Sequence, residues 1–285
     1  MADKVWLGDK LVEEADAKIS VFDHCLLYGD GIFEGMRCYS GKVFRLKEHL
    51  DRLWDSAKAL HLEIPMTREQ ITDATYATLK ANGHDDAYIR LVVTRGCGNL
   101  GLDLDRCKNP MVIIIAQGLS LYSDDLYVKG MKLVTASTLR MPSSSMNPRI
   151  KSCNYLNNIL AKYEGTIAGC EEVLILNHQG NVAECSGDNI FIVKKGVLYT
   201  PATDSCLLEG ITRAAVIEVA TELQIPFRER TITRHDVYIS DECFLTGSAA
   251  EVIPVTSVDN RIIGSGVAGP ITTKILAAYR KMVRQ

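Results

Sequence analysis

The sequence predicts an α+β fold for a chain of 285 residues. Two runs rich in β-branched residues, at 88–95 and 111–117, are typical of buried strands. Later segments alternate apolar runs with short glycine-containing turns, which is typical of β-hairpins. Other segments repeat apolar residues at spacings of three and four, the pattern of amphipathic helices. Hairpins mixed with helices favour α+β over a regular alternation of parallel strands and helices.

The N-terminal part is predicted to contain two helices followed by two paired strands. The apolar side chains of KEHLDRLWDSAKAL recur at helical spacing: Leu50, Leu53, Trp54, Ala57 and Leu60. Arg52 lies on the opposite flank of this helix. Thr67 and Gln70 match a capping box at the start of the next helix, ITDATYATLKAN, which Gly83 closes. The two β-branched runs follow, and we expect them to pair in one sheet.

A polar stretch bounded by glycines, GLSLYSDDLYVKG, interrupts the strand pattern and predicts a domain boundary. We expect a small N-terminal domain at 1–117, an interdomain loop at 118–130 and a large C-terminal domain at 131–285. The large domain begins with the strand MKLVTAS, and Lys151 then lies at the entry to a helix. The apolar residues of that helix are Leu156, Ile159, Leu160 and Tyr163. Two hairpins follow, EVLILN with NVAECS and NIFIV with VLYT, and then the helix ITRAAVIEVATEL, the strand ECFLTG and the terminal helix ITTKILAAYRKM.

Composition and charge argue against several classes of protein. A formal net charge of -3, with no basic run longer than Lys194-Lys195, argues against nucleic-acid binding. No stretch approaches the roughly 18 apolar residues of a membrane span, so we expect a soluble, cytoplasmic protein. Nine cysteines are scattered without a CxxC pair, which argues against a zinc site and a disulfide framework. We expect no metal.

Two segments, 96–101 and 264–269, match the dinucleotide-binding pattern GxGxxG. The first is followed by LDLDRCKNP, which does not predict a helix, and the second lies close to the end of the chain. A nucleotide-binding unit needs a helix after the glycines and an acidic residue further on. The sequence therefore does not favour a nicotinamide-dependent enzyme.

Several residues match what pyridoxal chemistry needs: a lysine amine, an acid for the pyridine nitrogen and donors for the phosphate. Lys151 stands at a loop-to-helix junction poor in charge, although a lysine taken alone is far more often a solvated charge at a helix entry. Glu184 lies among apolar and small residues, where an unpaired carboxylate is costly. The segments 210–213, at a helix start, and 246–250, after a strand, can offer backbone N–H groups to an anion.

Eight separated motifs occur in order across most of the chain: YGDGIFEGMRCY, RLKEHLDRL, YIR, KSCNYLNN, NVAE, LEGITR, TGSAAE and GPIT. Together they resemble the class IV aminotransferases, specifically the branched-chain amino-acid aminotransferases. The resemblance implies a two-domain fold type IV enzyme with a small N-terminal α/β domain and a larger, barrel-like C-terminal domain. It also implies pyridoxal 5'-phosphate as cofactor, and a homodimer or a higher homo-oligomer of dimers.

The resemblance also implies roles for single residues of this chain. Lys151 forms the Schiff base with the cofactor, Glu184 contacts the pyridine nitrogen and Tyr155 hydrogen-bonds the ring hydroxyl oxygen. The phosphate is held by Arg52, Ile211, Thr212 and Ser248, and the ring face is covered by Leu208. The substrate pocket is lined by Tyr28, Phe33, Gly35, Tyr88, Arg90 and Tyr122, and the α-carboxylate is bound by the backbone N–H groups of Ala249 and Ala250.

The implied reaction is transamination between branched-chain L-amino acids (Leu, Ile, Val) and 2-oxoglutarate, giving 2-oxo acids and L-glutamate by a ping-pong mechanism. Aromatic walls suit aliphatic side chains, since each buried methylene gains about 0.8 kcal/mol. D-amino-acid aminotransferases and aminodeoxychorismate lyases share the lysine and the acid, so both stay open, as does a catalytically idle cofactor-binding protein. Many relatives carry a Trp in the segment LSLYSDD, where this chain has Leu119, so pocket width and activity on aromatic amino acids or (R)-amines also stay open.

Overall fold

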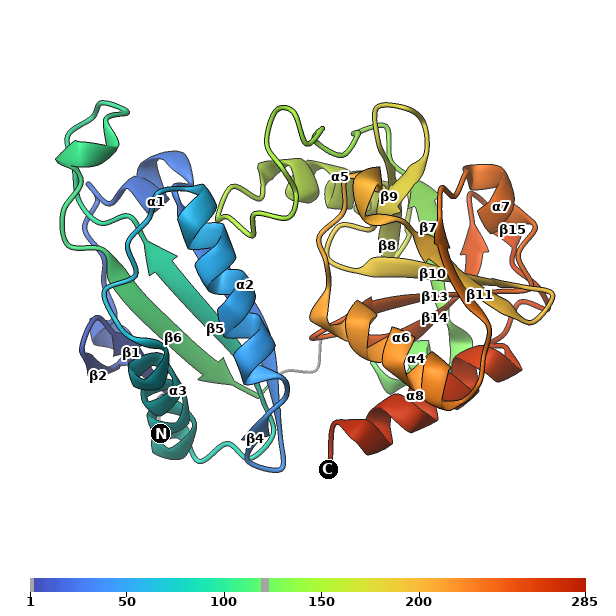
Figure 1. Ribbon diagram of the computed structural model, residues 1–285, viewed down its shortest axis with the longest axis horizontal. Helices are drawn as coiled ribbons and strands as arrows, with labels where there is room; N and C mark the ends of the chain where they lie inside the picture. Colours follow the sequence, from blue (N-terminus) through green and yellow to red (C-terminus); the bar gives the residue numbers. More distant parts are fainter. Residues whose placement is uncertain (1–2, 119–122) are drawn as a thin grey trace. The chain divides into compact units, whose positions relative to one another are not determined.

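The computed structural model describes residues 3–118 and 123–285 (Figure 1). The chain divides into two compact units: unit 1 is Met1–Leu119 with Ile150–Tyr155, and unit 2 is Ser120–Arg149 with Leu156–Gln285. This division falls inside the stretch expected as an interdomain loop, but part of that stretch is the helix α4 (Asp124–Lys129). The segment Ile150–Tyr155, which we expected in the C-terminal domain, groups with unit 1 because its backbone pairs with a strand of that unit. The identity of these units with two domains stays a prediction.

Unit 1 is built on a six-stranded sheet with the order β2-β1-β6-β5-β3-β4. Its strands are β1 (Lys4–Leu7), β2 (Lys10–Glu13), β3 (Gly31–Tyr39), β4 (Lys42–Val43), β5 (Ala87–Thr94) and β6 (Met111–Gln117). Strand β5 pairs antiparallel with both β3 and β6, which confirms the expected pairing of the two β-branched runs. The hairpin of β1 and β2 and the strand β3 were not among the expected elements.

Unit 1 has three described α-helices, of which the second and third were predicted from the periodicity of the sequence and the first was not. They are α1 (His24–Tyr28), α2 (Leu46–Ala59) and α3 (Arg68–Asn82), with short 3-10 turns at Glu14–Asp16 and Leu104–Arg106. The capping box at the start of α3 is confirmed, because the Thr67 hydroxyl accepts from Gln70 N and the Gln70 side chain accepts from Thr67 N. Gly83 ends the helix with a φ of 67°, a left-handed conformation that favours glycine.

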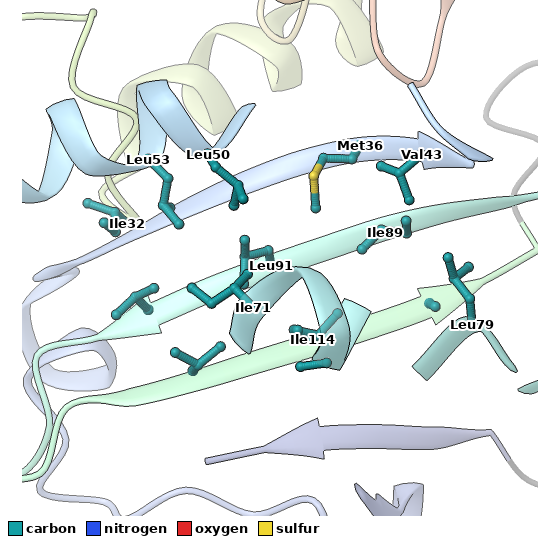
Figure 2. Close-up of a cluster of buried hydrophobic side chains, with 14 of the residues drawn as sticks. Ile32, Met36, Val43, Leu50, Leu53, Ile71, Leu79, Ile89, Leu91 and Ile114 are labelled. Atoms are coloured by element: carbon teal, nitrogen blue, oxygen red, sulfur yellow. The ribbon is translucent and has the colours of Figure 1, made fainter. Parts of the chain in front are cut away.

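One face of the unit 1 sheet packs against α2 and α3 and forms an apolar core (Figure 2). Figure 2 shows these core side chains on the strands and helices: Ile32, Met36, Ile89, Leu91, Ile114, Leu50, Leu53, Ile71 and Leu79. Because side chains alternate across a strand, the residues between them lie on the opposite face of β3 and β5. That opposite face carries Phe33, Gly35, Tyr88 and Arg90. These pocket residues expected from the sequence therefore lie on the side of the sheet away from the apolar core.

In the described part of the chain, unit 2 has a nine-stranded sheet with the order β12-β11-β10-β13-β14-β7-β8-β9, and β15 pairs with β14. Its strands are β7 (Met131–Thr135), β8 (Glu172–Leu176), β9 (Val182–Glu184), β10 (Asn189–Lys194), β11 (Val197–Pro201), β12 (Phe227–Arg230), β13 (Glu242–Gly247), β14 (Glu251–Val258) and β15 (Arg261–Ile262). The antiparallel pairs β8 with β9 and β10 with β11 are the two hairpins predicted from the sequence, which are thereby confirmed. Strand β7 runs parallel to both of its neighbours.

The longer helices of unit 2 are α5 (Leu156–Ile167), α6 (Ile211–Glu222) and α8 (Pro270–Met282), each at a position expected from apolar periodicity. A short helix, α7 (Arg234–Tyr238), and a 3-10 turn at Thr203–Ser205 complete the unit. The mixture of antiparallel hairpins, a few parallel strand pairs and separate helices confirms the α+β class. Among the described residues, no helix is both long enough and apolar enough to cross a membrane.

Candidate active site

Lys151 lies in an extended segment that runs antiparallel to the beginning of β3. Phe33 N donates to Lys151 O at 3.0 Å, Cys153 N donates to Gly31 O at 2.8 Å, and a bridge joins Ile32 to Ser152 between these two bonds. The segment therefore acts as a short additional strand of unit 1, and the helix α5 begins only at Leu156. This pairing fixes the backbone that carries the lysine.

The side chain of Lys151 ends among aromatic rings. Its Nζ lies 3.3 Å from Tyr155 Oη and 4.6 Å from the centroid of the Phe33 ring. The rings of Phe33 and Tyr155 meet edge to face, with centroids 5.0 Å apart. An amine beside a phenol and over a ring face gains from both the hydrogen bond and the ring quadrupole.

The residues Phe33, Gly35, Tyr88 and Arg90 are brought together on the face of the sheet that lies away from the apolar core. The Arg90 guanidinium stands 4.4 Å from the centroid of Phe33 and 5.6 Å from that of Tyr88. A Cβ added at Gly35 would lie 2.3 Å from Tyr88 Oη, so the missing side chain makes room for the phenol. Burial raises the pKa of Tyr88, so this hydroxyl stays protonated.

On the core face of β3, the carboxylate of Glu34 is held by two side chains of α2. Arg52 donates from Nε to Glu34 Oε1 at 2.8 Å and from Nη2 to Oε2 at 2.7 Å, and His49 Nδ1 lies 2.7 Å from Oε2. Burial alone would raise the pKa of Glu34, but the Arg52 charge and the bonds from Arg52 and His49 lower it to about 2. Burial lowers the pKa of His49, which keeps the imidazole neutral at pH 7.

Arg52 lies on the flank of α2 away from its apolar stripe, but its side chain is not solvated. Its side chain is 13% exposed, and its guanidinium is oriented by the fully buried Glu34. Periodicity placed Arg52 away from the apolar stripe, and that was correct. No local pattern indicated the carboxylate, because Glu34 stands 18 residues earlier, on a strand that was not among the expected elements.

Tyr28 is a further residue that was expected in the pocket. Tyr28, at the end of α1, is 39% exposed, and its hydroxyl donates to Leu100 O at 2.7 Å. Its ring meets the His24 ring edge to face at 5.0 Å. Tyr122 and Leu119 lie outside the described residues.

In unit 2, the Glu184 carboxylate sits at the end of β9 and is 5% exposed. Arg140 Nε lies 2.7 Å from Glu184 Oε1, an ionic contact without the direction of a good hydrogen bond. Glu184 Oε2 accepts from Leu208 N at 3.0 Å and from Asn189 Nδ2 at 3.3 Å. Arg140, which was not among the residues expected from the sequence, lies in the loop after β7 and gives this buried carboxylate an opposite charge.

The segment 210–213, which the sequence predicts to offer N–H groups to an anion, forms the start of α6. Ile211 and Thr212 form its first turn, where backbone N–H groups have no partner within the helix and the helix dipole is positive. Gly210 precedes them, and a Cβ there would lie 2.1 Å from Asn189 Oδ1. The glycine therefore lets the start of α6 approach the side chain that also binds Glu184.

The small-residue turn at 246–250 joins β13 to β14. Thr246 Oγ1 is buried and has no hydrogen-bond partner among the described residues. A Cβ at Gly247 would lie 2.0 Å from Asp188 Oδ1, so the backbone passes close to that carboxylate. Ser248 and Ala249 are partly exposed, whereas Ala250 is buried and its carbonyl accepts from Tyr127 Oη at 3.0 Å.

Comparison with known proteins identifies the family. The family description Amino-transferase class IV matches residues 31–258, which is more than half of the chain. The protein therefore belongs to the class IV aminotransferases and is an enzyme of that type. The cofactor of this family is pyridoxal phosphate, as the sequence predicted.

The most similar proteins include a putative branched-chain-amino-acid aminotransferase of Methanocaldococcus jannaschii, 49% identical over 278 residues, covering 97% of this chain and 95% of the relative. The branched-chain-amino-acid aminotransferase of Pseudomonas aeruginosa is 40% identical, with 99% of this chain and 94% of the relative covered. The T.th. branched-chain amino acid aminotransferase, solved with pyridoxamine 5'-phosphate, matches with a TM-score of 0.95 and 38% identity, covering 100% of this chain and 96% of that one. These comparisons confirm the resemblance and the fold type IV class.

Proposed function

We propose that the enzyme transfers the amino group of leucine, isoleucine or valine to 2-oxoglutarate, giving branched-chain 2-oxo acids and L-glutamate. The observation that carries the proposal is the Lys151 amine, 3.3 Å from the Tyr155 hydroxyl and above the Phe33 ring. A positioned amine of this kind can attach a carbonyl cofactor and then move protons. Relatives that are 40% and 49% identical and named for branched-chain amino acids support the substrate class.

The residues of unit 2 fit pyridoxal 5'-phosphate. The first turn of α6 is an anion-binding group for the phosphate, and the buried Glu184 carboxylate is a partner for a protonated ring nitrogen. The buried Thr246 hydroxyl lacks a partner among the described residues, and a bound polar ligand is a usual reason for such a group. When bound, the cofactor supplies an electron sink for the charge that develops at the substrate Cα.

We assign the following roles to the chain's own residues. Lys151 is the covalent attachment point of the cofactor, and Tyr155 orients it through a hydrogen bond to the ring hydroxyl oxygen. Once a substrate amino group had taken its place, the Lys151 amine would be free to take a proton from the substrate Cα and deliver it to the cofactor's carbon. A second 2-oxo acid reverses these steps, so the two half-reactions follow a ping-pong order.

Glu184 would hold the protonated ring nitrogen, and the neighbouring Arg140 gives this buried carboxylate an opposite charge. The first-turn N–H groups of Ile211 and Thr212 hold the phosphate, together with the side chains of Arg52 and Ser248. Leu208 packs on the ring face, while its backbone N–H fixes Glu184. Family membership supports assigning these groups to the same cofactor molecule as Lys151.

The face of the unit 1 sheet that bears Phe33 and Tyr88 supplies the substrate pocket in this proposal. Aromatic rings favour an aliphatic side chain through apolar burial. Arg90 is a cation on the same face and suits a carboxylate of the substrate. Tyr28 adds a further wall, and the backbone N–H groups of Ala249 and Ala250 receive the α-carboxylate.

We also propose that the enzyme is at least a homodimer, on the evidence of the helix α5. Its polar side chains point inward: Asn158 bonds to Arg140 and Ser186, and Glu164 accepts from Ser137 and Thr138. Its large apolar side chains are 51–71% exposed: Leu156, Ile159, Leu160, Tyr163 and Ile167. A neutral apolar stripe can face its own copy across a two-fold axis without like charges meeting. Light scattering of wild type and Leu160→Lys tests this, since the charge should lower the mass to that of a monomer.

The reaction is tested by the absorption spectrum of the purified enzyme with pyridoxal phosphate. We expect a band near the visible edge that is lost with L-leucine, recovers with 2-oxoglutarate and is absent or altered in Lys151→Ala. Loss of the band with D-alanine alone would move the enzyme to the D-specific branch of the fold. Release of the amine without any 2-oxo acid acceptor would instead make it a lyase, and no band at all would overturn the proposal.

A further inference from the structure

The backbone N–H of Lys151 is bound by a side chain from α2. Lys151 N donates to Ser56 Oγ at 3.1 Å, while Lys151 O accepts from Phe33 N at 3.0 Å. Lys151 therefore bonds to β3 through its carbonyl oxygen, whereas its N–H bonds elsewhere. On the other side of the peptide, the N–H is held by a hydroxyl 95 residues away in sequence.

Ser56 is an unusual choice for its position, which suggests a specific role. It stands in the last turn of α2 and is 2% exposed, and serine is neither a strong helix former nor a good residue to bury without a partner. Three of its neighbours on the helix that are equally buried are apolar: Leu50, Leu53 and Ala57. The Ser56 hydroxyl is thus a buried polar group beside the apolar stripe of α2, where it accepts the Lys151 N–H.

His49 and Arg52 lie on the same flank of α2 as Ser56, because His49 is three residues before Arg52 and Arg52 is four residues before Ser56. His49 and Arg52 hold Glu34 of β3, so this flank is clamped to the sheet by a buried ion pair. Ser56 is therefore presented to Lys151 from a helix whose position relative to β3 is fixed. The position of the hydroxyl is set by buried groups.

Lys151 has a long, flexible side chain, and only a fixed Cα keeps its amine near the Tyr155 hydroxyl and above the Phe33 ring. A displacement of about 1 Å in a reacting group can lower a rate by about 100-fold. We propose that Ser56 is a positioning residue for the Lys151 amine, acting through the hydrogen bond from the Lys151 backbone. This inference rests on the proposed role of Lys151.

The test measures how fast the protein stripped of cofactor captures added pyridoxal phosphate on Lys151. In this step the amine condenses with the aldehyde and releases one water, and borohydride reduction with peptide mass mapping locates the product. Ser56→Ala should slow capture about tenfold, because the Lys151 N–H loses its acceptor. Ser56→Thr keeps the hydroxyl and should restore the rate.

Thr75→Val is the matched control. Thr75 is a fully buried helical residue of the same unit whose hydroxyl donates to Ile71 O, a bond within its own helix. The substitution should lower thermal stability without changing the capture rate. If Ser56→Ala does not fold, Ser56→Cys replaces it, since a thiol has nearly the same shape but is a weak acceptor.

The outcomes separate this inference from the proposed function. Slow capture in Ser56→Ala or Ser56→Cys, with a normal rate in Ser56→Thr and Thr75→Val, supports the inference. A normal capture rate in the Ser56 variants, with only a loss of stability like that of Thr75→Val, overturns it. If the wild-type protein captures no cofactor at Lys151, the proposed function fails first.

Discussion

The buried ion pair between Glu34 and Arg52 makes stability depend on acid pH in a way that can be calculated. The pKa of Glu34 falls from 4.5 to about 2 in the folded protein, where its side chain is fully buried. A shift of one pKa unit corresponds to about 1.4 kcal/mol. The ionised carboxylate therefore contributes about 3 kcal/mol to the free energy of unfolding.

The sign follows from the direction of the shift. Because the folded pKa lies below the unfolded one, the contribution is fully present above pH 4.5 and is lost as the pH falls toward 2. Glu34→Gln removes the titrating group and leaves Arg52 without its opposite charge. The difference in unfolding free energy between wild type and Glu34→Gln should be about 3 kcal/mol at pH 7, and it should shrink steadily between pH 4.5 and pH 2.

Urea unfolding followed by circular dichroism at pH 7, 5, 4 and about 3 measures this difference directly. Glu63→Gln removes an exposed carboxylate of the same unit and should change the free energy by less than about 0.5 kcal/mol. A gap between wild type and Glu34→Gln that is the same at pH 7 and about 3 would refute the assignment of the low pKa to Glu34.

Two further predictions concern unit 1. Gly35→Ala should lower kcat/KM for leucine about tenfold, because the new Cβ would lie 2.3 Å from Tyr88 Oη and force the ring to move. Gly118→Ala, where a Cβ meets no atom of the described residues within 4 Å, is the control, and an equal loss in both variants would argue against a pocket at Gly35. Thr67→Ala should cost about 1 kcal/mol and lower Tm by about 2–4 °C by removing the capping bond to Gln70, whereas Thr67→Ser should keep most of the stability; equal melting temperatures for the two would contradict the capping role.

Much of the local structure was predictable because its causes lie within a few residues of one another. The capping box of α3, the two hairpins of unit 2 and the helices α6 and α8 follow from apolar spacing, turn residues and capping groups. The order of short motifs was enough to predict the family, which the comparisons confirm. The strand β3 was missed, because its nearly continuous burial removes the alternation that marks a half-exposed strand.

The helix α5 shows where periodicity reaches its limit. The sequence has a clear stripe at Leu156, Ile159, Leu160 and Tyr163, which ordinarily faces a core, yet these side chains are exposed. The buried residues of the helix are instead Asn158, Ala161 and Gly165, and Glu164 bonds to Thr138. A helical pattern indicates which residues share a face, but it does not indicate which face the rest of the chain covers.

The sequence by itself determined the longer helices, the two hairpins of unit 2, the family and the residue types that the chemistry needs. The tertiary structure alone decided which groups hold those residues: Glu34 for Arg52, Arg140 for Glu184 and Ser56 for Lys151. These partners stand as far as 95 residues apart in sequence, and no local pattern of spacing or propensity records them. Folding removes water from around these charges and N–H groups. A polar group that loses its water needs a hydrogen-bond or ionic partner, and the tertiary fold supplies that partner from a distant part of the chain.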